Sequence, residues 1–295
     1  MKANPVAPFF GACLLAVATL ASADICVRDD RDRELCLPAP AQRIVSLSPG
    51  VTELLFDAGA GDSVVGTSTF SDYPAAAQSV PRVGSYQRID LEALLALQPD
   101  LVIAWNSGSP TAQVERLESL RIPVFWSEQE NFEDVASSLE RYGRLAGTIA
   151  VAGPLAQAFR DAVEDIRQRH RDAPPVEVFY QLWEDPLMTL NGDHLISHAL
   201  QLCGASNIFA SLKRLTPKID VESVLDQNPE AILVGGMGES NDEWLQPWRA
   251  YPGLQAVAQG NLFFVPPSML QRPTPRILDG IRLVCDHMDV VRARR

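Results

Sequence analysis

The sequence predicts an α/β protein with two lobes, each built on a mainly parallel sheet, joined by a single long interlobe helix. The first observation is a repeated unit. Residues 90–103 and 220–233 both run from a capping Asp through an amphipathic helix and a Pro to an acidic residue and a short apolar strand. Strand and helix patterns also alternate on both sides of one long helical stretch, which is typical of parallel sheets with right-handed crossovers. Two lobes imply a cleft, where small molecules bind.

The N-terminus has the pattern of a secretory signal peptide over residues 1–23. Lys2 supplies the positive end, residues 9–20 form the apolar core, and Ala21-Ser-Ala23 is a small-residue cleavage site. The apolar core is too short for a membrane anchor, and no second run of about 18 or more apolar residues follows. We therefore expect secretion to the periplasm, with lipidation of Cys13 as a minor alternative.

Strands and helices alternate around the first repeat. Residues 43–47 form a short apolar run, and Ser48-Pro49 then opens a helix, because Pro is favoured at the first helical position. Apolar residues three and four positions apart mark the later helices. The expected elements are the strand 43–47, the helix 50–58, the strand 64–66, the helix and strand of the first repeat, a helix to 120, the strand 123–126 and the helix 132–145.

A long helix is expected over residues 154–170, ending at Ala173-Pro-Pro175. No strand precedes it and it lies between the two halves, so we assign it to the connection between the lobes. The second half then restarts with the strand 176–182, the helix 194–202, a turn at 204–205, the second repeat, a helix, the strand 262–265 and a closing helix from 274. The predicted domains are the N-terminal lobe 24–146, the interlobe helix 147–173 and the C-terminal lobe 174–295.

The composition excludes some partners. The chain has 295 residues, 46% of them hydrophobic, and a formal net charge of −12. So acidic a surface disfavours binding to nucleic acid or to anionic lipid. We expect a monomer.

The cysteines point to disulfides, because an exported protein folds in an oxidising compartment. Five are present, and four remain after the signal peptide. Cys26 and Cys36 bracket an expected hairpin, and Cys203 and Cys285 lie at the ends of two helical patterns. We expect the pairs Cys26–Cys36 and Cys203–Cys285, although four cysteines allow three connectivities. Zinc is the competing interpretation, and the chain has no Cys-x-x-Cys pair to favour it.

Several motifs resemble the periplasmic vitamin B12-binding proteins of bacterial ABC transporters. Residues 43–54 read Arg-Ile-Val-Ser-Leu-Ser-Pro-x-x-Thr-Glu-Leu, residues 71–74 read Ser-Asp-Tyr-Pro, and residues 99–105 read Pro-Asp-Leu-Val-Ile-Ala-Trp. The resemblance continues through residues 203–209 and 268–276 and spans nearly all of the mature chain. It implies two α/β lobes joined by one rigid helix, with the ligand held between them. Siderophore, haem and metal binders of the wider group share several of these motifs.

Aromatic residues at loops and strand ends are the candidate ligand contacts. Phe70, Tyr86 and Trp105 lie there in the first half, and Trp183 follows the first strand of the second half. Open α/β sheets bind ligands at the carboxyl ends of their strands, and a corrin offers broad apolar faces to such side chains. The resemblance implies cleft aromatics at the first three positions, while Trp183 neighbours Leu182, where the family has an aromatic. Packing between the lobes is the alternative role.

Arg272 closes a stretch that the resemblance places at the corrin edge. The family has an Asp and two aromatics before this Arg, where the present chain has Ser268, Met269 and Leu270. The retained guanidinium can donate to amide or carboxylate groups, and a surface salt bridge is the alternative. These departures extend the expected ligands from cobalamin to cobinamide or another cobamide.

Glu92 and Glu222 occupy matching positions in the two repeats, each two residues after the capping Asp. The resemblance implies that they are the two carboxylates that dock on arginines of the transporter membrane subunits. Two exposed acids at a fixed separation can register a two-lobed protein on a two-fold-symmetric partner. Stabilisation of the helix start by a negative charge is the alternative.

Other functional classes find less support. His194 and His198 are spaced to share a helix face as metal ligands, but no His precedes residue 170, which excludes a metal held by His from both lobes. The chain has no nucleophile elbow of the form Gly-x-Ser-x-Gly and no P-loop. A secreted hydrolase is therefore the least favoured alternative, and no cofactor is expected.

The expected function is capture of a corrinoid, cobalamin or cobinamide, and its delivery to the membrane subunits of an ABC importer. The corrinoid is then a transported ligand and not a cofactor. An iron-siderophore or haem binding protein of the same fold is the alternative.

Overall fold

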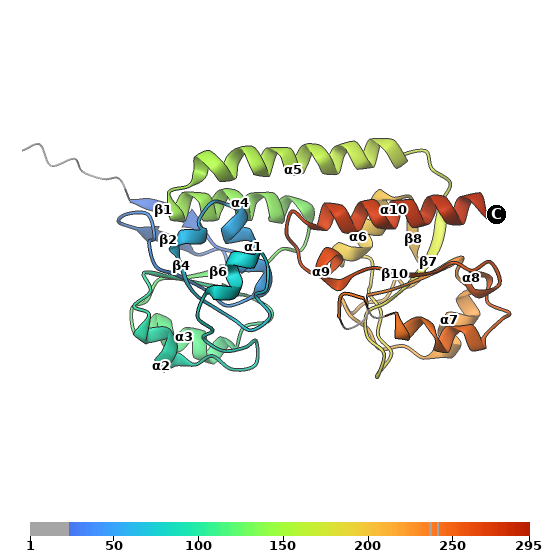
Figure 1. Ribbon diagram of the computed structural model, residues 1–295, viewed down its shortest axis with the longest axis horizontal. Helices are drawn as coiled ribbons and strands as arrows, with labels where there is room; N and C mark the ends of the chain where they lie inside the picture. Colours follow the sequence, from blue (N-terminus) through green and yellow to red (C-terminus); the bar gives the residue numbers. More distant parts are fainter. Residues whose placement is uncertain (1–23, 236–237, 241) are drawn as a thin grey trace, which may run out of the picture.

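The computed structural model describes residues 24–235, 238–240 and 242–295. It contains two four-stranded sheets, each at the centre of one lobe, with the long helix α5 (Ile149–His170) running along both lobes (Figure 1). The predicted signal peptide, residues 1–23, lies outside the described residues. In the described part of the chain, no helix combines the length and apolar character needed to cross a membrane.

The first lobe is built on a parallel sheet. Its strands, in spatial order, are β4 (Val64–Thr67), β3 (Ile44–Ser46), β5 (Leu101–Trp105) and β6 (Val124–Ser127). Its helices are α1 (Pro49–Asp57), α2 (Leu91–Ala96), α3 (Thr111–Ser119) and α4 (Phe132–Ala146). Alternate strand residues pack on opposite faces, with Ile103 and Phe125 on the face that α1 and α4 cover and Val102 and Trp126 on the other.

The second lobe repeats this topology. Its parallel strands, in spatial order, are β8 (Ala205–Asn207), β7 (Val176–Gln181), β9 (Ala231–Val234) and β10 (Leu262–Phe264). Its helices are α6 (Leu195–Leu202), α7 (Val221–Gln227), α8 (Gln255–Ala258), α9 (Pro267–Leu270) and α10 (Ile277–Ala293). In both lobes the spatial order is second, first, third and fourth strand along the chain. The repeat predicted from sequence supplies the third strand and the helix before it.

The acidic residue of each repeat ties the third strand to the first. The Asp100 carboxylate accepts the backbone N–H groups of Gln42 (2.8 Å) and Arg43 (2.9 Å), and the Asp100 N–H donates to the Arg43 carbonyl (3.0 Å). In the second lobe, Glu230 accepts the N–H of Glu177 and donates its own N–H to the Glu177 carbonyl, both at 2.9 Å. The repeated acid therefore has the same structural role twice, at the amino edge of each sheet.

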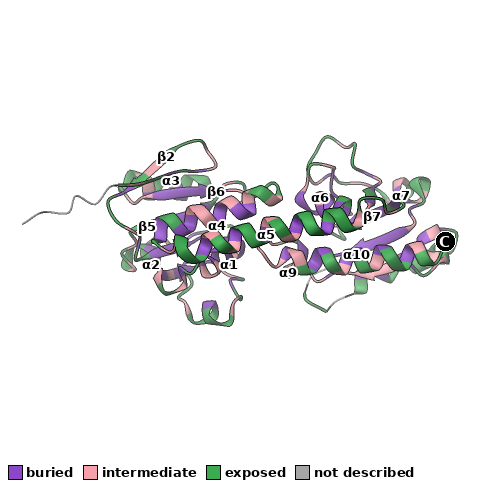
Figure 2. Cartoon of the chain, turned by 90° about the horizontal axis from the view of Figure 1, so that it is seen from above, coloured by how far each residue is buried: buried purple, intermediate pink, exposed green. Residues whose placement is uncertain are grey.

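The helix α5 starts five residues earlier than predicted. The prediction at Pro154 was wrong, because it took this residue as the first helical position when it lies inside the helix. The preceding helix α4 ends at Gly147 in the left-handed conformation (φ 74°), which turns the chain back so that α5 packs along α4. Phe159 and Ile166 of α5 join a hydrophobic cluster that continues into the second lobe. Figure 2 shows α5 running across both lobes, with buried and exposed positions alternating along it.

Two other differences from the sequence analysis exceed one residue. The expected turn is present at Gly204 (φ 66°), but Ala205 begins β8, a short edge strand that pairs with β7 and was not predicted. The closing helix begins at Ile277 instead of 274, because Thr274 is buried and hydrogen-bonds to the first lobe. The domain boundaries themselves stay a prediction.

Both expected disulfides are present. Cys26–Cys36 joins β1 (Ile25–Arg28) to β2 (Glu34–Leu37) across the expected antiparallel hairpin. Cys203–Cys285 joins the end of α6 to α10, over a sequence separation of 82. The four sulfurs are therefore bonded to one another and do not offer thiolates to zinc.

Candidate functional site

Segments that follow strands of the two sheets meet at the contact between the lobes. Glu53 lies on α1, which follows β3, and Asp72 lies in the loop after β4. Arg272 follows β10 and α9 in the second lobe, and its Nη1 donates to Glu53 Oε1 (2.8 Å) and Asp72 Oδ1 (2.6 Å). Since open α/β sheets bind ligands at the carboxyl ends of their strands, the candidate site lies here.

Glu53 is the centre of the polar contact between the lobes. It is 0% exposed, and beyond Arg272 it accepts hydrogen bonds from Thr274 Oγ1 (3.0 Å) and from Nε (3.0 Å) and Nη2 (2.8 Å) of Arg276. A buried carboxylate is stable only when it is paired and hydrogen-bonded, as it is here. From the sequence, Glu53 was identified only as part of the motif at residues 43–54 and was given no role. A Glu flanked by Thr52, Leu54 and Leu55 was the available sign of burial.

Asp72 is held by the second lobe. Its partial burial would raise its pKa, but the hydrogen bond and charge of Arg272 outweigh this effect and lower the pKa below its ordinary value. Burial would lower the pKa of Arg272, but its hydrogen bonds to Asp72 and Glu53 and the charges of these two acids raise it above its ordinary value. Both groups stay charged, so the contact is an ion pair.

Phe70 is the most exposed of the predicted aromatics, at 70%. Its backbone is left-handed (φ 65°), which is costly for a bulky residue and occurs where surrounding contacts impose it. Its carbonyl accepts from the Asp72 N–H (3.0 Å) and from Arg272 Nη2 (3.3 Å). Nearby, the Arg276 guanidinium lies 3.7 Å from the centre of the Tyr73 ring. Arginines of the second lobe thus hold the aromatic loop of the first.

Trp105 and Tyr86 also lie on the carboxyl side of the first sheet. Trp105 ends β5, is 38% exposed and donates its indole N–H to Glu128 Oε1 (2.9 Å). Tyr86 is 56% exposed in a turn in which Ser85 Oγ accepts the N–H groups of Gln87 (3.2 Å) and Arg88 (3.3 Å). Sequence reasoning identified both aromatics but not Glu128, which has no distinguishing motif.

Trp183 follows β7 in the second lobe, as expected. It is 40% exposed, its indole donates to the Asp185 carbonyl (3.1 Å), and its ring meets Trp244 edge to face at 5.7 Å. Leu182, where the family has an aromatic, is partly buried against the hydrophobic core. Trp183 therefore offers one aromatic surface from the second lobe, beside the carboxyl end of β7.

Glu92 and Glu222 are both exposed in the first turns of α2 and α7. Each helix is capped by the preceding Asp, with Asp90 accepting from Ala93 N (3.0 Å) and Asp220 from Ser223 N (2.8 Å). The helices α2 and α7 lie in different lobes, on the side of the molecule opposite α5 (Figure 1). The arrangement leaves one acidic group per lobe accessible from that side.

Comparison with known proteins agrees with this geometry. A model of the periplasmic binding protein family matches residues 44–269. Vitamin B12-binding proteins of Vibrio campbellii and Yersinia pestis are each 35% identical to the chain, over 87% and 86% of its length and 92% and 89% of theirs. This chain belongs to the periplasmic binding protein family.

Solved structures of the family have the same fold. The crystal structure of the periplasmic vitamin B12-binding protein of Vibrio cholerae matches with a TM-score of 0.79 and 34% identity, covering 86% of this chain and 98% of that one. A periplasmic haem-binding protein from Roseiflexus matches with a TM-score of 0.75 at 20% identity, which shows a shared fold alone.

One residue of the histidine pair, His194, has a structural role in this family member. His194 caps α6, because its Nδ1 accepts the Ile196 N–H (3.1 Å). Burial, followed by the charge of His198, lowers the pKa of His194 to about 4. The Nδ1 atom of His194 is therefore occupied by the helix start.

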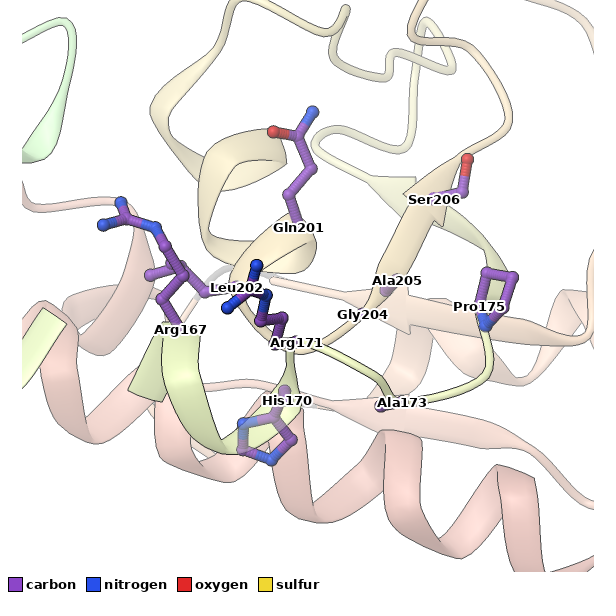
Figure 3. Close-up of a pocket in the computed structure, with 10 residues that line it drawn as sticks. All are labelled: Arg167, His170, Arg171, Ala173, Pro175, Gln201, Leu202, Gly204, Ala205 and Ser206. Atoms are coloured by element: carbon purple, nitrogen blue, oxygen red, sulfur yellow. The ribbon is translucent and has the colours of Figure 1, made fainter. Parts of the chain in front are cut away.

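Two surface hollows lie away from the lobe contact of this periplasmic binding protein. One, of about 390 Å³, is lined by the end of α5 and the start of β8, including Arg167, Gln201 and Ser206 (Figure 3). The other, of about 440 Å³, lies between the hairpin and the end of α3. Neither contains a predicted site residue, so we place the site by the exposed aromatics and the sheet ends.

Proposed function

We propose that this chain is a periplasmic solute-binding protein that captures a corrinoid between its lobes and delivers it to an ABC importer. The observation that carries the proposal is the set of exposed aromatics, Phe70, Tyr86 and Trp105, at the carboxyl side of the first sheet. The identity to proteins named vitamin B12-binding protein, over most of both chains, supports a corrinoid as the ligand class.

The chemistry of these side chains suits a macrocycle. A corrin is broad and largely apolar on its faces, and aromatic rings bind such surfaces by burying area and by offset stacking. Phe70, Tyr86 and Trp105 are 38–70% exposed, so their rings have area left to bury. Trp183 adds a fourth ring from the second lobe.

Arg272 is proposed to meet the polar edge of the ligand. A guanidinium has five N–H donors. The bonds described for Arg272 run from Nη1 to Glu53 and Asp72 and from Nη2 to Phe70. The Nε donor and one Nη2 donor can therefore serve amide or carboxylate groups of a corrinoid while the ion pair stays formed.

Glu92 and Glu222 are proposed to dock the loaded protein on the membrane subunits. Both are exposed at helix starts, one in each lobe. Carboxylates form strong charge-assisted bonds with arginines, and two such points fix the orientation of the complex.

Calorimetry with the purified mature protein tests the ligand class. Cyanocobalamin, cobinamide, haemin and a ferric hydroxamate siderophore are titrated separately under the same conditions. We expect saturable binding of at least one of the two corrinoids. Saturable binding of haemin or the siderophore, with no heat from either corrinoid, would contradict the proposal and favour the alternative ligand class.

A further inference from the structure

The Trp105 indole is hydrogen-bonded to an acidic side chain, Glu128, which follows β6. We propose that Glu128 is a positioning residue that holds the Trp105 indole as a rigid platform for the ligand. The inference rests on the proposed function, because it assumes that Trp105 contacts the bound molecule. Glu128 itself is assigned no contact with the ligand.

The Glu128 carboxylate bridges two groups of the Trp105 loop. Its Oε1 accepts the indole N–H of Trp105 (2.9 Å), and its Oε2 accepts the backbone N–H of Ser107 (2.8 Å). The ring also lies directly on Gly108, where an added Cβ would stand 1.9 Å from Cε3 of the indole. One face of the ring is therefore supported by backbone and its edge by a carboxylate, and Trp105 as a residue is 38% exposed.

Glu128 is in turn fixed by the N-terminal hairpin. Its backbone N–H donates to Asp30 Oδ2 (2.7 Å), in the turn between β1 and β2. Asp30 forms an ion pair with Arg141 of α4 (2.5 Å), and its own N–H donates to the carbonyl of Trp126 (2.9 Å). The carboxylate that holds Trp105 is thus attached to a turn braced by both a strand and a helix.

The same turn braces the other side of the loop. Arg31 donates from Nε to Asn106 Oδ1 (2.6 Å), and its guanidinium lies 3.3 Å from the centre of the Trp126 ring. The Asn106 N–H donates to the carbonyl of Ser127 (2.9 Å). Residues next to Trp105 and Glu128 are therefore linked through one turn, whose ends the Cys26–Cys36 disulfide joins.

A platform held in this way lowers the entropy that is lost when the ligand binds. Ordering one mobile side chain in an interface weakens binding by about three- to tenfold, and a side chain already ordered avoids this loss. A hydrogen bond from the indole to a carboxylate is also stronger than one to water or to a neutral group. Removing Glu128 should therefore reduce affinity without removing any ligand contact.

The test compares Glu128→Ala and Glu128→Gln with Glu130→Ala, an exposed acid two residues further on. The first readout is the indole ¹H–¹⁵N resonance of Trp105 in the ligand-free protein, assigned with Trp105→Phe. The Trp126 indole, which donates to Glu118 (3.1 Å), serves as an internal reference. The second readout is the affinity for cyanocobalamin and cobinamide by calorimetry.

We expect Glu128→Ala to shift the Trp105 resonance, speed its exchange with water and weaken corrinoid binding by about three- to tenfold. Glu128→Gln keeps one acceptor oxygen, which can serve the indole or the Ser107 N–H but not both, so its affinity should lie between those of wild type and Glu128→Ala. An unshifted Trp105 resonance in Glu128→Ala, or a shifted one with unchanged affinity, would overturn the inference. If wild-type protein binds neither corrinoid, the proposed function fails, and the indole resonance still decides whether Glu128 fixes Trp105.

Discussion

Two carboxylates one turn apart on α1 have opposite surroundings. Glu53 accepts hydrogen bonds from three residues of the second lobe. Asp57 has one carboxylate oxygen buried without a hydrogen-bond partner among the described residues. Burial, followed by the negative charge of Glu53, raises the pKa of Asp57 to about 6, although Arg276 acts in the opposite direction. Of the two, Asp57 is the one that works against folding at neutral pH.

This raised pKa predicts a pH-dependent difference between wild type and Asp57→Asn. The folded protein binds a proton at Asp57 more tightly than the unfolded chain does. Protonation of Asp57 therefore stabilises the folded protein; this stabilisation is fully present below pH 4 and is lost as the pH rises through about 6. Asn stays neutral. The difference in the free energy of unfolding, Asp57→Asn minus wild type, should be larger at pH 7.5 than at pH 4 by roughly 2 kcal/mol. Urea denaturation at the two pH values measures it.

The comparison isolates Asp57 because every other group titrates in both proteins. Replacing the exposed Asp62 of the same lobe by Asn is the matched control for removing a solvated carboxylate. If the stability difference between wild type and Asp57→Asn is the same at pH 4 and pH 7.5, Asp57 has the same pKa in the folded protein and in the unfolded chain, which would contradict the prediction.

Sequence reasoning located aromatics but missed the polar residues that hold them. Trp105 and Tyr86 could be placed because aromatics are scarce in this chain and these two occur at strand ends and loops. Glu128 and Glu53 could not, because their partners lie in distant segments, such as Asp30 and Arg276. The apolar neighbours of Glu53 indicate burial, but nothing in the local sequence identifies the two arginines that pair with it.

Helices and strands could be predicted where a periodic hydrophobic pattern was followed by a residue that ends a helix. Each repeat has a capping Asp, a helical period and a Pro, and both gave a helix followed by a strand. The strand β8 was missed because Ala-Ser-Asn has little strand propensity and forms only by pairing with β7. The start of α5 was misplaced because packing against α4 stabilises the turn before Pro154.

The contact between α1 and the segment after α9 predicts a large effect of Glu53→Ala. Removing the carboxylate leaves the arginines at positions 272 and 276 partly buried without their shared partner. Breaking a buried ion pair in this way should lower the free energy of unfolding by about 3–5 kcal/mol in urea denaturation.

The matched control for Glu53 is Asp279→Ala, which removes an exposed ion pair with Arg282 within α10. This pair should contribute about 0.5 kcal/mol or less. A Glu53→Ala protein as stable as the Asp279→Ala control would mean that the contact between the lobes does not depend on the buried carboxylate.

The placement of Glu92 and Glu222 on one side of the two-lobed molecule predicts a separation of binding from delivery. Both lie away from the lobe contact, so Glu92→Ala and Glu222→Ala should leave ligand affinity unchanged. Uptake should slow and complex formation with the transporter should weaken, most in the double variant, because two tethering points reinforce each other. Raising the salt concentration should weaken the wild-type complex in the same direction.

Uptake by cells at limiting ligand, with equal periplasmic amounts of each variant, measures this effect. Glu115→Ala, an exposed acid on α3 of the first lobe, is the control. If the double variant supports uptake at the wild-type rate, Glu92 and Glu222 only stabilise the starts of their helices and do not dock the transporter.

The aromatic surface at the carboxyl side of the first sheet is proposed to hold a corrinoid. The most direct test of this proposal is calorimetric titration of cyanocobalamin and cobinamide into wild type, Trp105→Ala, Tyr86→Ala and Tyr251→Ala. Tyr251 lies in the second lobe and is about as exposed as Trp105. We predict that the first two variants lose about 1 kcal/mol or more of binding free energy, a several-fold weaker affinity, while Tyr251→Ala binds like wild type. Unchanged affinity in both Trp105→Ala and Tyr86→Ala, with the fold intact, would contradict the account.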